Sequence, residues 1–377
     1  MNKTLIPGLG LTLLTACGSS DPGPGDPNAR VSAPQAEQQI VNFANFVEEI
    51  GPDTLAAFTK ETGIAVNYDV YETNLVLESK LLVGSTGLDL VVPGNNFLER
   101  QIQAGIYRRL DKRLLPNLRH LDPEILRQLE TNDPGNQYAV PYLWGTTAFG
   151  YNVAKIEAAI GGPAPDSWAL LFDPAYASRI ANCGISLADS PWMMTSFALM
   201  YLGRDPNSER PEDLAAAMQV LGAIRPHVRD ITSGLVTTAL VEGEICFAVG
   251  PNADFRAARN LARETGRDVE IRYVIPKEGA ILWVDTLAVP ADAPHPQLAH
   301  RLIDFLMRPE IIAGVTEATG FASANVAGTA LVAEDLRRDP IVYPDTATRQ
   351  RLHMNAAMSA DFTRIQNREF DRFRTGN

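Results

Sequence analysis

Two hydrophobic periodicities alternate along the chain after residue 38. Apolar runs of the strand type fall at residues 39–43, 64–71 and 88–92. Between and after them, apolar positions recur with helical spacing at 52–62, 74–83 and 95–104, and Gly63 follows the first of these helices as a stop signal. Strands that alternate with helices predict an α/β sheet whose strands are joined by crossover connections.

The pattern changes at residues 138–152, an extended and aromatic-rich stretch that suits a crossing between two lobes. A second α/β set follows, with a strand at 184–187, a helix at 211–224 and a strand at 245–249. Further strands are predicted at 271–275 and 286–289, with 281–284 as a return crossing. The C-terminal third is predicted to be mostly helical, at 297–307, 309–316 and from 346 onward.

The first 17 residues have the pattern of a targeting segment rather than of a folded element. Lys3 precedes an apolar run at residues 5–14, which is shorter than the roughly 20 residues that span a bilayer. The run ends in Leu14, Thr15, Ala16 and Cys17, which looks like a bacterial lipobox. We expect Cys17 to be lipidated. The alternative is an ordinary signal peptide in which this cysteine is coincidental.

Residues 18–37 are rich in Gly, Pro, Ser and Asp and offer almost nothing to bury. This composition is typical of a flexible, solvated tether. No later segment is a transmembrane candidate on hydropathy. We therefore expect an exported, periplasmic domain that is attached to an envelope membrane through a lipid anchor only.

Charge and motifs exclude several classes of function. Of 377 residues, 45 are acidic and 33 are Lys or Arg, a net charge of −12, whereas nucleic-acid binding favours the opposite balance. The five histidines have no metal-ligand spacing, and P-loop, dinucleotide-binding and nucleophile-elbow motifs are missing. We expect no catalytic residues, no metal and no cofactor. An enzyme with an unrecognised carboxylate pair stays open as an alternative.

Cysteine usage agrees with export. Apart from Cys17, the chain contains only Cys183 and Cys246. They can form one disulfide in an oxidising compartment, or remain two buried thiols.

Four segments carry a resemblance to a known family: residues 61–112, 138–152 (YAVPYLWGTTAFGYN), 201–208 and 275–294 (IPKEGAILWVDTLAVPADAP). Over residues 38–377 the chain resembles the polyamine-binding (putrescine/spermidine) solute receptors of ABC importers. The resemblance implies a monomer of two discontinuous α/β lobes, 38–143 plus 284–322 and 144–283 plus 323–377, which close on a ligand by hinge bending. It also implies an ABC permease and its ATPase as partners, and a disulfide between Cys183 and Cys246.

Such a receptor needs carboxylates and aromatic walls, because alkyl amines are protonated at neutral pH and an unpaired buried cation is costly. Asp254, Asp285 and Trp283 match the acidic and aromatic ligand contacts of the family. Other positions depart from it. The family typically has Asn-Trp-Ser-Asp-Tyr where this chain reads Asn-Phe-Ala-Asn-Phe, and polar, acidic or phenolic positions are replaced elsewhere. The remaining candidate contacts are Phe43, Asn45, Phe46, Gly94, Trp192 and Phe321.

These departures predict a ligand of lower charge than spermidine. An ammonium–carboxylate pair near 4 Å contributes about 4 kcal/mol at an effective dielectric of 20, before desolvation. Two carboxylates balance two positive charges but not three or four. A putrescine-like diamine, an agmatine-like guanidino amine or a monocation with an apolar tail fits this count. A receptor of the same fold for a different amine, or one serving a sensory partner, is the alternative.

Overall fold

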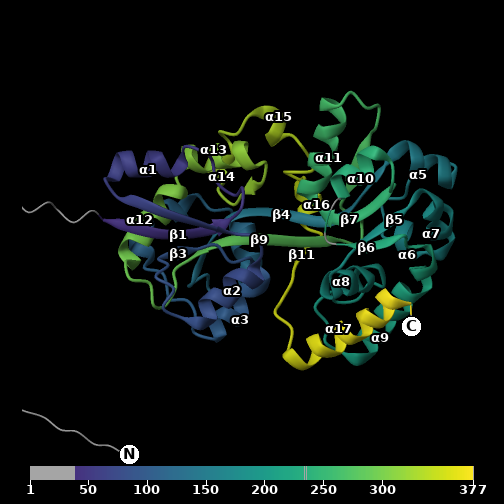
Figure 1. Ribbon diagram of the computed structural model, residues 1–377, viewed down its shortest axis with the longest axis horizontal. Helices are drawn as coiled ribbons and strands as arrows, with labels where there is room; N and C mark the ends of the chain where they lie inside the picture. The colour runs from purple at the N-terminus through teal and green to yellow at the C-terminus, as the bar shows by residue number, and fades with distance from the viewer. Residues whose placement is uncertain (1–38, 233, 235, 377) are drawn as a thin grey trace, which may run out of the picture. The chain divides into compact units, whose positions relative to one another are not determined.

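The computed structural model describes residues 39–232, 234 and 236–376. The predicted lipobox with Cys17 and the predicted tether lie outside the described residues. The chain from Gln39 onward forms one compact unit around a mixed β-sheet (Figure 1). Its principal strand order is β2-β1-β3-β9-β4-β7-β5-β6. The strands are β1 (Ile40–Phe46), β2 (Ala65–Tyr71), β3 (Leu90–Val91), β4 (Ala139–Asn152), β5 (Ile185–Ala188), β6 (Asp230–Thr232), β7 (Phe247–Pro251), β8 (Ile271–Val274), β9 (Ala280–Ala288), β10 (Ala322–Ser323) and β11 (Leu352–Met354).

The two ends of this sheet are parallel, and its middle is antiparallel. At one end β1 pairs in parallel with β2 and β3, and at the other β5 pairs in parallel with β6 and β7. Between them β4 and β9 run antiparallel over most of their length. Figure 1 shows these two strands passing from one group of helices, which includes α2, α3 and α12, to a second group around α5–α9. They are therefore the main covalent connections between the halves.

Helices cover the sheet, and several begin and end where the sequence predicts. The helices predicted at 74–83 and 211–224 have those bounds, and α1 ends at Gly63, which adopts a left-handed φ of 73°. The helices are α1 (Thr54–Thr62), α2 (Asn74–Val83), α3 (Asn95–Gln103), α4 (Pro123–Leu129), α5 (Val153–Ile160), α6 (Ala169–Phe172), α7 (Pro174–Ile180), α8 (Pro191–Tyr201), α9 (Pro211–Ile224), α10 (Val236–Glu242), α11 (Asn252–Glu264), α12 (Pro296–Leu306), α13 (Pro309–Thr319), α14 (Val326–Thr329), α15 (Glu334–Arg337), α16 (Thr346–Arg349) and α17 (Ala360–Thr375).

Two predictions of elements need correction. The segments predicted separately at 281–284 and 286–289 form the single strand β9, because Asp285 interrupts the apolar run without interrupting the backbone pairing. The helical character predicted from 346 onward is broken by β11, which pairs in parallel with β9 and buries Leu352 and Met354. Only after this strand does α17 begin, and it packs against α8 and α9.

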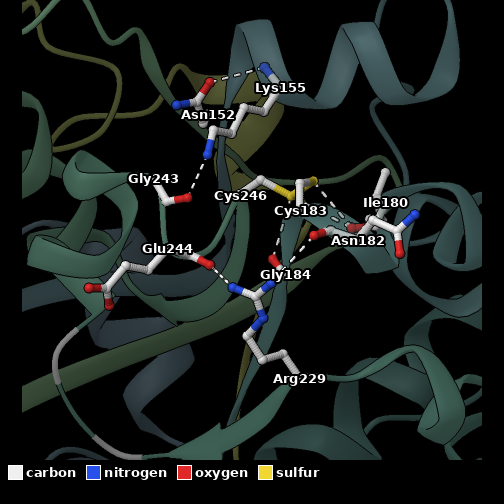
Figure 2. The surroundings of a disulfide bond; sticks show 10 residues. All are labelled: Asn152, Lys155, Ile180, Asn182, Cys183, Gly184, Arg229, Gly243, Glu244 and Cys246. Carbon is white, nitrogen blue, oxygen red and sulfur yellow. Dashed lines mark hydrogen bonds between the residues drawn. A yellow bond between two sulfur atoms is a disulfide. The ribbon is translucent and has the colours of Figure 1, made fainter.

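The predicted disulfide between Cys183 and Cys246 is confirmed (Figure 2). It joins the turn before β5 to the residue before β7, with the two Cα atoms 5.4 Å apart. The adjacent backbone is also paired, since the Cys246 amide donates to the Gly184 carbonyl at 2.9 Å. By loop-closure entropy, a bond across 63 residues stabilises the fold by about 4 kcal/mol. The bond therefore fixes the neighbouring strands β5 and β7.

Across the described residues, no helix is both long enough and apolar enough to cross a bilayer.

Candidate ligand-binding site

The site is built on the middle of β9, where Trp283 and Asp285 lie two residues apart and so face the same side of the sheet. Gly145 of β4 lies opposite Trp283, and Leu143 lies opposite Asp285. Both predicted contacts therefore come from the strand pair that connects the two halves.

Gly145 leaves room for the indole of Trp283. A Cβ atom at position 145 would lie 2.2 Å from Cζ2 of Trp283 and 2.6 Å from Oδ1 of Asn252. Phe321, which precedes β10 on the other side of β4, packs edge-on against the indole with the ring centroids 5.4 Å apart. A residue without a side chain thus allows two aromatic rings to meet across the central strand.

Gly94 brings the start of α3 close to Asp285. Its backbone forms an isolated bridge with Asp285, and a Cβ atom here would lie 3.3 Å from Oδ1 of that carboxylate. Oδ1 of Asn74 accepts the Gly94 amide hydrogen at 2.8 Å. The small residue therefore lets the side chains of Asn74, Asn96 and Asp285 come close to the backbone at the start of α3.

Asp254 enters the same neighbourhood from the first turn of α11, directly after β7. The helix start is fixed to β4, because Oδ1 of Asn252 accepts the Thr146 amide hydrogen at 3.3 Å. Since Asn252 lies beside Gly145, the first turn of α11 adjoins the Trp283 indole. Asp254 and Asp285 thus lie on elements packed around the same stretch of β4.

Asp285 is buried and Asp254 is half-buried, and burial raises their pKa values, to about 6 for Asp254 and about 7 for Asp285. Across the described residues, neither is held by a Lys, Arg or His side chain or by a hydrogen-bond donor. Buried carboxylates in folded proteins are normally paired. These two therefore leave a negative charge for a cation from outside the chain.

A third buried carboxylate, Glu49, was missed in the sequence analysis. Its residue is only 8% exposed, and its Oε2 atom has no hydrogen-bond partner. Burial, followed by the negative charge of Asp285, raises the pKa of Glu49 well above its usual range. The signal in the sequence was its place just beyond the carboxyl end of a parallel strand, where ligand sites of α/β sheets gather.

The three predicted contacts on β1 have different surroundings. Phe43 is fully buried in the core, with its ring 5.4 Å from that of Tyr68. Asn45 holds the next turn, because its Nδ2 donates to the Glu49 carbonyl at 3.1 Å and its Oδ1 accepts from the Phe46 amide at 2.8 Å. Phe46 is half-buried, and its ring lies edge-on at 4.7 Å from Tyr71. Of the three, Phe46 offers a partly accessible apolar face.

Trp192 borders a cavity of its own. It stands on α8 and lines a cavity of about 150 Å³ together with Asn96 and Phe97 of α3 and Gln366 of α17. The lining of that cavity includes none of the other predicted ligand contacts.

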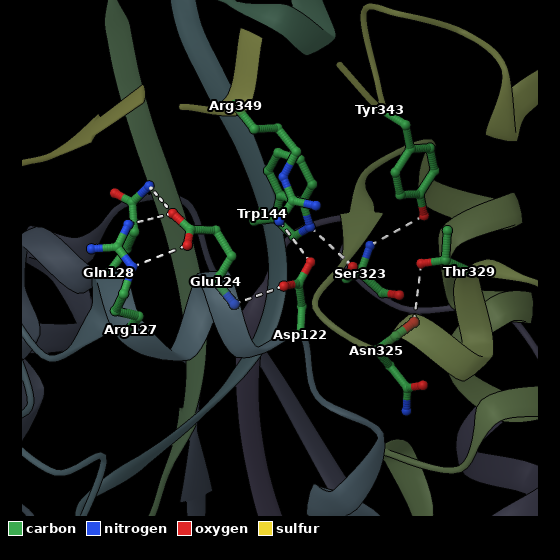
Figure 3. Close-up of polar contacts among 10 residues, drawn as sticks. All are labelled: Asp122, Glu124, Arg127, Gln128, Trp144, Ser323, Asn325, Thr329, Tyr343 and Arg349. Atoms are coloured by element: carbon green, nitrogen blue, oxygen red, sulfur yellow. Dashed lines mark hydrogen bonds and ion pairs between the residues drawn. The ribbon is translucent and has the colours of Figure 1, made fainter. Parts of the chain in front are cut away.

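Trp144 supports the crossing strand from the side of β4 opposite Gly145 (Figure 3). Its indole nitrogen donates to the Ser323 carbonyl at 2.9 Å. The Arg349 guanidinium lies 5.4 Å from the centre of the Trp144 ring and forms an ion pair with Asp122 at 2.6 Å. These contacts attach the returning C-terminal segment to β4 beneath the site.

No group of three His, Cys, Asp or Glu side chains with metal-binding geometry occurs within the described ranges. The arrangement offers acidic groups and aromatic walls, and no cationic side chain of the described residues pairs with Asp254 or Asp285. It suits reversible binding of a small positively charged molecule.

The chain is similar in sequence to known bacterial binding proteins. The sequence profile of the bacterial extracellular solute-binding proteins matches residues 53–341. The putrescine-binding periplasmic protein SpuD of Pseudomonas aeruginosa (strain UCBPP-PA14) is 42% identical over 345 residues, covering 91% of this chain and 94% of that protein. A putrescine/agmatine-binding protein of Pseudomonas aeruginosa PAO1 is 38% identical over 370 residues, covering 98% of each.

Among solved structures, the spermidine/putrescine ABC transporter substrate-binding protein PotD of Streptococcus pneumoniae superposes with a TM-score of 0.80 at 24% identity. The match covers 90% of this chain and 99% of that one. The fold class predicted from the sequence, α/β with two lobes about a ligand cleft, is thereby confirmed.

Proposed function

This chain belongs to the bacterial extracellular solute-binding protein family, and we propose that it is the substrate-binding component of an ABC importer for a small cationic amine. Binding without chemistry is the activity that fits the relatives, which are named as binding proteins. In this role the ligand stabilises a closed state of the receptor. The closed receptor delivers the ligand to the permease, which its ATPase drives.

One observation carries the proposal: the buried Glu49 and Asp285 and the half-buried Asp254 have no cationic partner in the described part of the chain. Removing carboxylates from water is unfavourable unless charge or hydrogen bonds compensate. An ammonium group supplies both, and charge-assisted hydrogen bonds are about twice as strong as neutral ones.

A putrescine-like diamine fits the walls as well as the charges. Its four methylene groups need an apolar surface, which the rings of Trp283, Phe321 and Phe46 provide. Its two ammonium groups then face Asp254 from one side and Asp285 from the other. An agmatine-like molecule matches the same pattern with a guanidinium at one end.

Cellular placement follows from the N-terminal pattern and the periplasmic relatives. We place the folded part in the periplasm as a monomer, attached to an envelope membrane through a lipid on Cys17. We propose that the lobes divide at residues 143/144 in β4, 283/284 in β9 and 322/323 in β10, so that hinge bending acts on the strands that carry the site.

A second candidate is a receptor of the same fold for another amine, or one that serves a sensory partner. It is favoured by the replaced positions on β1, where the Asn45 side chain forms hydrogen bonds with the backbone of the following turn.

Isothermal titration calorimetry of the purified protein tests the proposal with four ligands: putrescine, agmatine, spermidine and butylamine. Putrescine or agmatine should bind at least 10-fold more tightly than spermidine and butylamine. Tighter binding of spermidine would contradict the proposed preference for a diamine or a guanidino amine. No binding of any of the four would contradict the proposed function and favour the second candidate.

A further inference from the structure

We propose that Glu49 is a further ligand-binding residue, and that its carboxylate acts together with that of Asp285 on one cationic end of the ligand. The inference rests on the proposed function, because it assigns a residue within that same site. None of the relatives' names, and none of the positions derived from the resemblance, points to Glu49.

The turn after β1 gives two consecutive glutamates opposite environments. Glu48 adopts a left-handed φ of 63° and is exposed, whereas Glu49 is buried. A positive φ is uncommon for a residue other than glycine and costs of order 1 kcal/mol or more. The surroundings hold the turn in place, since the Glu49 carbonyl accepts hydrogen bonds from Asn45 Nδ2 at 3.1 Å and from Tyr142 Oη at 2.9 Å. The fold therefore maintains a strained turn that directs one glutamate inward.

Within the part of the chain that the structure describes, the Glu49 carboxylate has acidic and phenolic neighbours and no cationic one. The Glu49 charge interacts with four groups on neighbouring strands. They are Asp285 of β9, Tyr68 and Tyr71 of β2, and Tyr142 of β4. Its Oε2 atom has no hydrogen-bond partner. A buried acid placed beside another buried acid destabilises the fold by itself. A ligand cation between the two carboxylates turns that repulsion into attraction.

The pair also compensates for a departure on β1. Asn45 stands where the resemblance implies an acidic residue, and its amide is used to hold the turn. Glu49, four residues later, places a carboxylate near Asp285. The charge available to the ligand is thereby restored by a residue of the loop rather than by one of the strand.

A measurable consequence concerns protons. Two neighbouring buried carboxylates share a proton at neutral pH when no cation is present. Burial raises the pKa values of both Glu49 and Asp285, in agreement with such sharing. When an ammonium group enters, it keeps its own protons, and the shared proton leaves the carboxyl group for the buffer. No covalent bond forms or breaks apart from this O–H bond.

The test is calorimetry of putrescine binding at pH 7.5 in buffers of different ionisation enthalpy. It compares the unsubstituted protein with Glu49→Gln, and with Glu48→Gln as the matched control. The unsubstituted protein and Glu48→Gln should each release a large fraction of one proton per ligand. Glu49→Gln should bind at least 10-fold more weakly and release a clearly smaller fraction of a proton than the unsubstituted protein. Its unfolding temperature without ligand should be equal or higher, so that weaker binding is not a sign of misfolding.

Equal affinity and equal proton release in Glu49→Gln would overturn the role of Glu49 and leave the proposed function intact. Release of no proton by the unsubstituted protein, despite binding, would overturn the shared pair independently of any variant. Absence of amine binding in the unsubstituted protein would instead overturn the proposed function, and this inference with it.

Discussion

Two buried acidic regions of the molecule have opposite surroundings. Asp213, at the start of α9, has a side chain only 1% exposed, and it is paired with Arg204 at 2.6 Å and Arg210 at 2.8 Å. A hydrogen bond from Ser208, followed by those from Arg210 and Arg204, lowers its pKa to about 2. Asp285 is also buried, yet burial without a partner raises its pKa to about 7.

The comparison shows that two aspartates with similarly little exposed surface serve two purposes. Where the chain supplies donors, as at Asp213, a carboxylate stabilises its own region. Where the described residues supply none, as around Asp285, Glu49 and Asp254, the carboxylate destabilises the ligand-free fold and retains its binding capacity for a cation. Unpaired buried charge thus distinguishes the site from the structural acids.

The largest expected effect is on binding by Asp285→Asn. Losing one charge-assisted contact and leaving an ammonium unpaired should weaken putrescine binding by about 3 kcal/mol, or roughly 100-fold. Calorimetry measures the loss. The ligand-free variant should unfold at an equal or higher temperature.

Asp213→Asn sharpens this contrast as the matched structural variant. It should lower the unfolding temperature by several degrees while leaving putrescine affinity unchanged, because Arg204 and Arg210 lose a buried partner on a helix that carries no candidate ligand contact. If both variants weakened binding equally, the distinction between paired and unpaired acids would be lost.

The second effect is a pH dependence whose sign differs between the two regions. Asp254 and Asp285 have pKa values raised to about 6 and about 7, so the folded state retains protons that the unfolded chain releases near pH 4. Their contribution to the free energy of unfolding therefore falls as pH rises from about 4 to 7, by about 3 kcal/mol for Asp254 alone. For Asp213, whose pKa is lowered to about 2, the contribution is lost as pH falls from about 4 to 2.

Urea unfolding between pH 4 and 8, with and without saturating putrescine, measures this dependence. The ligand should remove most of the decline above pH 5, because it favours the ionised carboxylates. A ligand-free stability that rises steadily to pH 8 would contradict the account.

The smallest expected effect concerns the aromatic wall. Gly145→Ala places a methyl group where the Trp283 indole lies and should displace the ring, weakening putrescine binding by about 1 kcal/mol, or roughly 5-fold. Gly162→Ala is a suitable control, because a Cβ atom there meets nothing within 4 Å. Unchanged affinity in Gly145→Ala would remove Trp283 from the ligand wall.

Much of the fold could be predicted from the sequence because its elements carry clear periodicity. The helix at 74–83 and the long buried strand at 138–152 are examples. β9 was divided in two because a polar Asp285 resembles a break, although it faces the site. β11 escaped detection because three residues pair only in the tertiary context of β9.

The site could be predicted in part. Asp254, Asp285 and Trp283 stood out through the resemblance, and the structure brings them around the same stretch of β4. Glu49 did not stand out in the sequence, because a pair of glutamates after a strand is typical of a solvated turn. Only the backbone conformation at Glu48 determines which of the two is buried.

A crystal structure of the putrescine complex tests the central claim most directly. The account predicts one ammonium nitrogen about 3 Å from the carboxylates of Asp285 and Glu49, and the other near Asp254, with the methylene chain against Trp283. Putrescine bound elsewhere, or bound here with all three carboxylates paired only to water, would contradict it.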